Sequence, residues 1–230
     1  MRRFGLDRLP GHDDVPYLDI WPDRLRGTGI EWDYPTRWPL RPENSLPVAG
    51  NRPAIVEGLP YERTVYVTAG TSHNTRPRVL ETMVTALHGE GVNVVVTIGG
   101  NGDRARFGPQ PDYVRIEHYV PQEQLLPHVD AVVCHAGAGT VLGALAHGVP
   151  LVISPLATDQ FDMATQVADA HAGVLAGSGA PSWHGIRDAA RLVRANPSYR
   201  ESAAAVTAQV FAMPPPAAIL DRLQAFANRS

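Results

Sequence analysis

The sequence predicts an α/β protein built on a Rossmann-like parallel sheet of about six strands. From residue 64 onward, continuous apolar runs rich in valine alternate with segments of helical period, and several runs end in glycine-rich or hydroxyl-bearing turns. Strands that are apolar at every position are buried on both faces, which is typical of a parallel sheet covered by helices on both sides. Ligands of such sheets lie outside the carboxyl ends of the strands, so a site is expected among those turns.

The expected strands are short and apolar, and they cover residues 64–69, 92–98, 114–117, 131–134, 150–154 and 173–175. Helices are expected where apolar residues recur every three or four positions. They cover residues 77–88, 121–126, 140–147, 161–170, 185–195, 199–211 and 217–227. Residues 176–184 are the most loop-like stretch after residue 70.

Residues 1–60 differ from the rest of the chain. They hold nine of the 21 prolines and three of the four tryptophans, Trp21, Trp32 and Trp38. Proline at this density favours an extended, irregular chain, and residues 16–21 are the best strand candidate. Two interpretations stay open: an arm that wraps the domain with its tryptophans, or the end of a preceding domain with a linker. We divide the chain into this segment and a domain of residues 61–230.

Composition excludes several classes of protein. A chain of 230 residues with 44% hydrophobic residues can bury a core, and its net charge of −3 gives no general attraction to nucleic acid or acidic membranes. No apolar run reaches the roughly 20 residues that span a bilayer, and no signal peptide is visible. Cys134 is the only cysteine, so no intrachain disulfide is expected and a cytoplasmic location fits.

Residues 131–148 carry the strongest local pattern. An apolar run meets the turn His-Ala-Gly-Ala-Gly-Thr, and a helix-forming segment follows at once. A helix N-terminus presents unpaired N–H groups and the positive end of its dipole, so this turn suits an anion such as a phosphate. Gly137 and Gly139 would let the backbone approach the ligand closely.

Three other turns are expected at the same edge of the sheet: residues 70–72, 119–122 and 155–160. Each has an ordinary structural explanation, because Thr71 and Asp159 can cap helices and Tyr119 can be a half-buried aromatic. His135 can likewise be a hydrogen-bonded turn histidine. Together the four turns match the needs of a nucleotide sugar: a flat side chain for the base, amides and hydroxyls for the diphosphate, and a carboxylate–amide pair for the sugar hydroxyls.

Other motifs predict no further chemistry. Residues 99–102 (Gly-Gly-Asn-Gly) follow a strand, but Phe107, Gly108 and Pro109 come next in place of a helix, so a surface loop is favoured over a dinucleotide site. Cys134 and His135 are adjacent strand residues that point to opposite faces, which argues against a nucleophile pair. The nine histidines show no metal-binding spacing, and no metal is predicted.

Residues 119–164 resemble the donor-binding signature of family-one glycosyltransferases of the GT-B fold, in particular the bacterial macrolide and antibiotic glycosyltransferases. Residues 67–74 resemble the first strand and turn of their C-terminal domain, and residues 197–206 the start of their closing helices. The resemblance covers about residues 61–227. It implies that the sheet is the C-terminal domain of a GT-B fold, preceded here by a proline-rich irregular segment.

The resemblance also implies which residues bind the donor. Tyr119 would stack on the base, the backbone of Val120 would pair with the base edge, and Gln122 would lie near the ribose. The diphosphate would be held by Thr71, His135, Gly137, Ala138, Gly139 and Thr140. Asp159 and Gln160 would bind sugar hydroxyls.

This sequence departs from the family pattern at two positions. Ala136 replaces the usual first glycine of a His-Gly-Gly turn, a change that is tolerated if its φ is negative. Gly143 stands where plant members carry a ribose-binding glutamate, a change common in the bacterial branch.

The function implied is the donor-binding half of a glycosyltransferase that moves a hexose from a dTDP- or UDP-sugar to a small-molecule hydroxyl. The transfer would be inverting and metal-independent, without a cofactor, and His135 would stabilise the departing diphosphate. Relatives carry the acceptor site and the general base on an N-terminal domain. His73 and His118 lie near the expected cleft, but neither matches the base position, so this chain is expected to be at most weakly active alone.

Two alternatives stay open. One is a non-catalytic or auxiliary nucleotide-sugar-binding module that pairs with a separate acceptor-domain chain through residues 1–60 and the C-terminal helix. The other is a sugar-nucleotide epimerase of the same architecture, which the turns at residues 135–140 and 159–160 disfavour.

Overall fold

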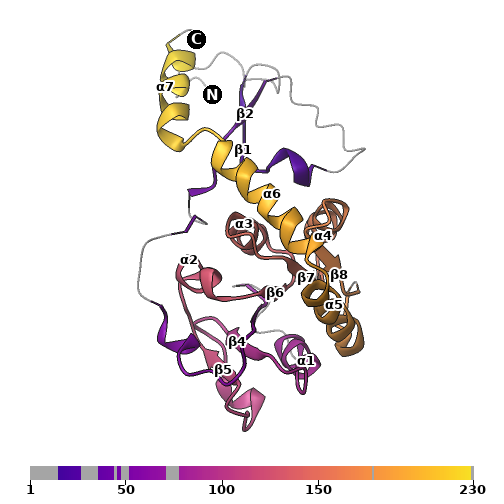
Figure 1. The fold of residues 1–230 in the computed structure, drawn as a ribbon. Coiled ribbons are helices and arrows are strands. Elements are labelled where there is room, and N and C mark those ends of the chain that lie inside the picture. Colours follow the sequence, from indigo (N-terminus) through magenta and orange to yellow (C-terminus); the bar gives the residue numbers. More distant parts are fainter. Residues whose placement is uncertain are drawn as a thin grey trace.

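A computed structural model describes residues 15–26, 36–43, 46–47, 52–70, 78–177 and 179–228. Its centre is a six-stranded sheet in the order β5-β4-β3-β6-β7-β8, in which every neighbouring pair is parallel (Figure 1). The strands are β3 (Thr64–Thr68), β4 (Asn93–Thr97), β5 (Val114–Glu117), β6 (Ala131–Cys134), β7 (Leu151–Ile153) and β8 (Gly173–Leu175). The α/β fold class and the six-stranded parallel sheet predicted from the sequence are confirmed.

Seven α-helices connect and follow these strands. They are α1 (Val79–Ala86), α2 (Gln122–Leu125), α3 (Ala138–Ala146), α4 (Gln160–Asp169), α5 (Trp183–Ala195), α6 (Ser198–Ala212) and α7 (Pro216–Ala227). Every predicted helix is present, with ends shifted by a few residues. The shift that matters is at α3, which begins at Ala138 rather than at Thr140 and so brings the glycine turn into the first turn of the helix.

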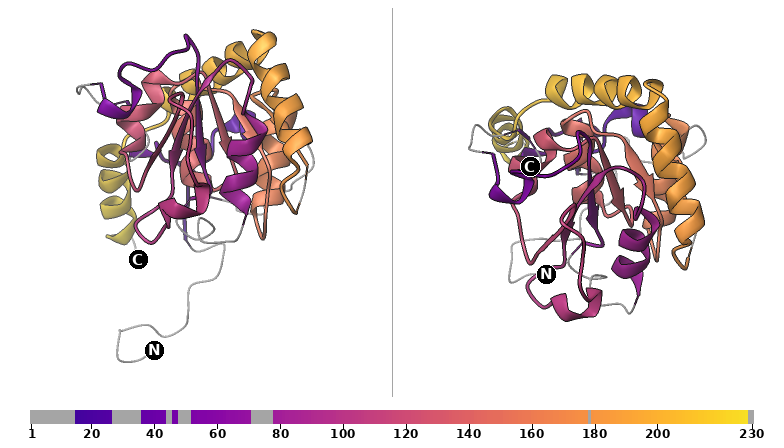
Figure 2. Two further views of the ribbon diagram at one scale, coloured as in Figure 1. Left: turned by 90° about the horizontal axis from the view of Figure 1, so that it is seen from below. Right: turned by 60° about the horizontal axis from the view of Figure 1, so that its bottom comes forward.

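Helices cover both faces of the sheet (Figure 2). The side chains of α2, α3, α4 and α6 form one apolar core on the first face, and those of α1 and α5 form a second core on the other. In β3 the alternation is direct, because Tyr66 belongs to the first core while Val65 and Val67 belong to the second. All five residues of β3 are buried, as expected for a central parallel strand.

The order of the strands places a topological switch beside β3. The chain runs from β3 outward through β4 to β5, and then returns to the other side of β3 as β6. Connections therefore leave the carboxyl ends of β3 and β6 in opposite directions, which opens a crevice between them. The turns after β3, β4, β6 and β7 meet at this edge.

The described parts of residues 1–60 pack on the C-terminal helices. Strands β1 (Tyr17–Asp19) and β2 (Arg37–Pro39) form a separate parallel pair beside α6 and α7 (Figure 1). Trp38 meets the Phe226 ring of α7 edge-on at 6.1 Å, and the Arg222 guanidinium lies 4.2 Å above its ring. The predicted strand at residues 16–21 is confirmed as β1, whereas β2 was not predicted, since it is three residues long and ends in proline. Trp32 lies outside the described residues.

Buried Asp19 holds this small unit together. Its carboxylate accepts hydrogen bonds from Arg26 and from Arg37, the latter at 2.6 Å, and caps the N–H of Trp21 at 2.8 Å. Leu25, in a short 3₁₀ turn after β1, is fully buried in the first core of the domain. The ion-pair cluster thus joins the described N-terminal residues to one another, while Leu25 in the first core and Trp38 against α7 anchor them to the domain.

None of the described helices is by itself long and apolar enough to cross a bilayer. The helices α6 and α7 meet the length and composition criteria only when taken together, and they bend by 45° where they join.

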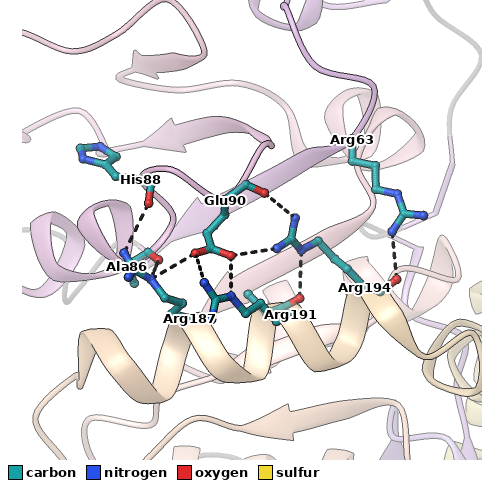
Figure 3. Close-up of polar contacts among 8 residues, drawn as sticks. Arg63, Ala86, His88, Glu90, Arg187, Arg191 and Arg194 are labelled. Atoms are coloured by element: carbon teal, nitrogen blue, oxygen red, sulfur yellow. Dashed lines mark hydrogen bonds and ion pairs between the residues drawn. The ribbon is translucent and has the colours of Figure 1, made fainter.

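A cluster of arginines around Glu90 fixes helix α5 to the turn between α1 and β4 (Figure 3). The Glu90 carboxylate, nearly inaccessible at 6% side-chain exposure, accepts two hydrogen bonds from Arg191, at 2.7 and 2.8 Å. Arg187 approaches it at 3.3 Å and Arg194 at 3.5 Å. The Arg191 hydrogen bonds, with the charges of Arg191, Arg187 and Arg194, lower the pKa of the Glu90 carboxyl despite its burial.

We expect Glu90→Gln to lower the free energy of unfolding by about 2 kcal/mol, because three guanidinium groups lose their shared anion. Since the folded-state pKa of Glu90 is lowered, its contribution is present above the unfolded pKa of about 4.3 and is lost as the pH falls through the folded value. Urea unfolding at several pH values should therefore show the difference between wild type and variant shrinking in acid.

Glu57→Gln serves as the matched control, since Glu57 is exposed and makes no ion pair with any described residue. A loss at Glu90 no larger than the loss at Glu57 would contradict a structural role for the cluster.

Candidate active site

A pocket of about 240 Å³ opens at the carboxyl ends of β3 and β4, against the start of α2. Its lining residues come from three segments of the chain and are Tyr66, Thr68, Gly70, Thr97, Gly99, His118, Tyr119, Val120, Gln122 and Glu123. Three of them, Tyr119, Val120 and Gln122, are residues that the sequence predicted for the base and the ribose. A larger hollow of about 440 Å³ lies between α1 and α5, where no strand ends.

The residues predicted for the base lie at the rim and wall of this pocket. Tyr119 is 75% exposed, so one face of its ring is open to a ligand. The side chain of Val120, next along the chain, is buried in the first core and fixes the backbone there. An exposed aromatic ring beside an anchored backbone can cover a flat heterocycle and pair with its edge.

His135 follows β6 and is buried between two glycines. A Cβ atom added to Gly70 would lie 2.6 Å from Cε1 of the imidazole, and one added to Gly137 would lie 2.8 Å from both Cε1 and Nε2. Neither distance is compatible with a real side chain, so the ring occupies space that only glycine leaves. Gly70 also has a φ of +67°, in the left-handed region. The turn after β3 and the turn after β6 therefore enclose the imidazole from both sides.

The N-terminus of α3 lies directly after this histidine. The carbonyl of Gly137 accepts the N–H groups of Thr140 and Val141, both at 3.0 Å. Within the part of the chain that the structure describes, no acceptor is bonded to the amides of Ala138 and Gly139, which stand at the positive end of the helix dipole. His135 and these two amides belong to the turn at which the sequence predicts an anion.

The backbone of Ala136 does not have the negative φ that was expected from the sequence. Its φ is +68°, whereas the replacement of glycine by alanine was expected to be tolerated with a negative φ. A left-handed alanine costs about 1–2 kcal/mol, and here the residue is completely buried in the first core, which holds it in place. The strain lies between His135 and the start of α3.

Cys134 is a buried core residue with no sign of reactivity. Desolvation raises the pKa of its thiol to about 12, so it carries no thiolate at neutral pH. This supports the view that Cys134 and His135 are not a nucleophile pair.

Polar groups on two apolar strands form the floor of the pocket, and sequence reasoning missed them. Tyr66 and Thr68 on β3 and Thr97 on β4 are buried, and their hydroxyl groups are joined by hydrogen bonds. The signal was present in the sequence: Tyr66 and Thr68 lie two residues apart, on one face of a strand whose opposite face carries Val65 and Val67.

The loop before α4 carries the two residues predicted for the sugar. Asp159 is exposed at the N-cap position, directly before α4, but its side chain does not cap the helix; it accepts the hydroxyl proton of Thr158 at 2.8 Å. Gln160 is buried, and its carbonyl oxygen accepts the N–H groups of Leu156 and Ala157, at 2.9 and 3.1 Å. Gln160 thereby fixes the loop that presents the Asp159 carboxylate.

Some predicted positions fall elsewhere. Thr71 and His73 lie outside the described residues. His118 does line the pocket, and its Nδ1 lies 3.2 Å from the carbonyl of Gly99. The Gly99 turn, interpreted from sequence as a surface loop, contributes to the pocket wall and is followed by a 3₁₀ turn over residues 104–107. Among the described residues, no group of three His, Cys, Asp or Glu side chains could hold a metal ion.

The parallel sheet, with its switch point beside β3, has the fold of the C-terminal half of a GT-B glycosyltransferase. The chain belongs to the family of erythromycin biosynthesis protein CIII-like C-terminal domains, whose profile matches residues 79–226.

The similar proteins are glycosyltransferases of antibiotic biosynthesis. The chain is 41% identical over 140 residues to 4'-demethylrebeccamycin synthase of Lentzea aerocolonigenes, covering 61% of this chain and 32% of that protein. It is 33% identical over 135 residues to demethyllactenocin mycarosyltransferase of Streptomyces fradiae, covering 59% and 28%. The chain thus spans about a third of the length of these curated relatives.

Solved structures share the fold. The spinosyn rhamnosyltransferase SpnG superposes with a TM-score of 0.77 at 27% identity, covering 97% of this chain and 59% of that one. The glycosyltransferase SnogD from Streptomyces nogalater superposes with a TM-score of 0.71 at 26% identity, covering 91% and 56%.

The packing around His135 leads to a test of its environment. We expect Gly70→Ala to lower the free energy of unfolding by about 1–2 kcal/mol, because alanine is strained at a left-handed φ. The added Cβ should also displace the imidazole of His135. Gly89→Ala is the matched control, since Gly89 also has a positive φ, +76°, but an added Cβ meets nothing within 4 Å.

Urea unfolding and the NMR signals of the His135 ring would be recorded for both variants. Only Gly70→Ala should shift the ring signals, and an equal shift in Gly89→Ala would contradict the proposed packing.

Proposed function

We propose that this chain is the donor-binding half of a glycosyltransferase that moves a hexose from a dTDP- or UDP-sugar to a hydroxyl of a small-molecule natural product. The observation that carries the proposal is the convergence at one sheet edge of a pocket with an exposed aromatic, a buried histidine and the free amides of α3. The structural neighbours support it: SpnG has been solved in complex with thymidine diphosphate and with spinosyn aglycone.

In this proposal the base, pentose, diphosphate and hexose of the donor lie one after another along the turns at this edge of the sheet. The base stacks on Tyr119 and pairs with the backbone of Val120, while Gln122 faces the pentose. The diphosphate rests on His135, Thr140 and the α3 turn of Gly137, Ala138 and Gly139, with Thr71 on the facing loop. The hexose meets the exposed carboxylate of Asp159. The Gln160 carbonyl oxygen is committed to the loop, so any contact of Gln160 with the sugar falls to its amide nitrogen.

The chemistry would be an inverting displacement without a metal ion. Negative charge grows on the diphosphate as the bond to the sugar breaks, and donors already directed at that position stabilise it without reorganisation. His135 and the α3 dipole are such donors. The general base would come from the acceptor-binding half, as the resemblance to the family implies.

The partner half would dock on the N-terminal unit. We assign residues 61–230 to the donor domain and residues 1–60 to a linker that ends the acceptor domain. A two-stranded parallel sheet is rarely stable alone, and Leu18 of β1 and Ile20 directly after it are exposed. Leu220 of α7 is exposed as well. Both halves are needed to hold the acceptor hydroxyl against the sugar, whether they come from one chain or two.

A second candidate is an auxiliary module that binds nucleotide sugars without catalysis. It is favoured by the same separate β1–β2 unit, which would serve as a docking surface for a catalytic chain. Such a module would bind donor but would not support transfer when combined with an acceptor half.

Calorimetric titration tests the donor site. The wild-type chain should bind dTDP or UDP, and His135→Ala should weaken binding by about 10- to 100-fold, as expected for a hydrogen bond to a charged group. His184→Ala, an exposed histidine at the start of α5, should bind like wild type. Absence of wild-type binding to both nucleotides, or an equal loss in both variants, would overturn the proposal.

Asp159 should distinguish the sugar from the nucleotide. We expect Asp159→Ala to bind dTDP like wild type but to lose about 3- to 30-fold in affinity for dTDP-glucose, because only the intact donor presents hexose hydroxyls to the carboxylate. Thr158→Ala, which removes the hydroxyl bonded to Asp159 but keeps the carboxylate, is the matched control. A parallel loss for dTDP and dTDP-glucose would refute the assigned role.

A further inference from the structure

The hydroxyl groups beneath the pocket form one chain of hydrogen bonds. Thr97 on β4 donates to the Thr68 hydroxyl on β3 over 3.3 Å. The N–H of Gly70 donates to the same oxygen over 3.2 Å. The Tyr66 and Thr97 hydroxyl oxygens lie 2.7 Å apart. The chain therefore runs from the Gly70 turn, which encloses His135, to the phenol of Tyr66.

The number of protons fixes the direction of the bond at Tyr66. A threonine hydroxyl has a single proton, and Thr97 gives it to Thr68. Either hydroxyl could donate in the contact between Thr97 and Tyr66, and with the Thr97 proton directed at Thr68 the donor there is Tyr66. Burial raises the pKa of the Tyr66 phenol, so the group keeps this proton at neutral pH.

A tyrosine that donates to Thr97 offers only lone pairs to its other neighbour, Gln122. The amide nitrogen of Gln122 donates to the Tyr66 hydroxyl over 3.2 Å and points to the Thr140 hydroxyl at 3.5 Å. The two ends of a glutamine amide exchange by rotation, and only the surrounding network decides between them. Tyr66 selects the orientation with nitrogen toward the protein. No described residue donates to the remaining carbonyl oxygen.

We propose that Tyr66 is a positioning residue of the donor site, which makes Gln122 an acceptor for a hydroxyl group of the donor's pentose. This inference rests on the proposed function, which places the nucleoside in the pocket that Gln122 lines. A carbonyl oxygen matches a hydroxyl donor, whereas a free amide nitrogen would match the carbonyl groups of a pyrimidine. In a thymidine nucleotide the 3′ hydroxyl is the only pentose hydroxyl that can donate.

Removal of the Tyr66 hydroxyl tests the proposal with two ligands. Tyr66→Phe keeps the volume of the ring but lets the Gln122 amide rotate, so the affinity for dTDP should fall by about 3- to 10-fold. For 3′-deoxythymidine 5′-diphosphate, which has no pentose hydroxyl, wild type and Tyr66→Phe should bind equally. Tyr113→Phe, a tyrosine away from the pocket, is the matched control and should bind both ligands like wild type.

Variants at Thr97 and Gln122 keep the test independent of any packing effect at Tyr66. Thr97→Val removes the acceptor of the Tyr66 proton and should also weaken dTDP binding, whereas Thr97→Ser keeps a hydroxyl and should restore it. In a Gln122→Ala background, Tyr66→Phe should have no further effect, since Tyr66 acts only through that amide.

The outcomes separate the two proposals. If wild type binds dTDP but Tyr66→Phe weakens dTDP and its 3′-deoxy analogue to the same extent, the positioning role is overturned and the donor site stands. An additive effect of Tyr66→Phe in the Gln122→Ala background would also overturn it. If wild type binds neither dTDP nor UDP, the proposed function fails, and this inference fails with it.

Discussion

The central place of β3 in the sheet is the constraint on which the rest of the site depends. This strand pairs in parallel with β4 on one side and with β6 on the other, so its backbone groups are committed along its whole length. Two parallel neighbours bring their carboxyl ends to the same edge, and the chain leaves that edge in opposite directions. The turn at Gly70 thereby meets the turn at His135, although the two are 65 positions apart in the sequence.

Polar groups inside this strand carry a cost that explains their arrangement. Burying a hydroxyl without a hydrogen-bond partner costs about 1–3 kcal/mol of folding free energy. Tyr66, Thr68 and Thr97 avoid this cost beneath the pocket because their hydroxyl groups form a connected set. A connected network of this kind also fixes the groups at its ends. One end is the Gly70 turn beside His135, and the other is the Gln122 amide at the start of α2.

Backbone strain is concentrated at the same place. Gly70, which contacts the imidazole, and Ala136, which directly follows His135, both have left-handed φ values. Strain of this kind persists where the surroundings over-determine the conformation. Here β6 ends in a buried residue and α3 begins two residues after Ala136, so the turn has no room to relax. The cost is borne at the turn that joins the histidine to the helix N-terminus.

The sequence by itself determined the sheet, the order of helices and strands, and the turns at its ligand edge, because valine-rich runs and helical periods are local signals. It also singled out Tyr119, Gln122 and His135 as site residues. In the structure Tyr119 and Gln122 line the pocket, and His135 lies against Gly70, which is another residue of the pocket lining. Only the tertiary structure decided that His135 is enclosed by Gly70 and Gly137, that Ala136 is left-handed, and that Gln160 holds its own loop. These features depend on contacts between strands that are distant in sequence. The hydrogen-bonded floor of Tyr66, Thr68 and Thr97 exists for the same reason, since a hydroxyl finds its partner only when two strands are aligned.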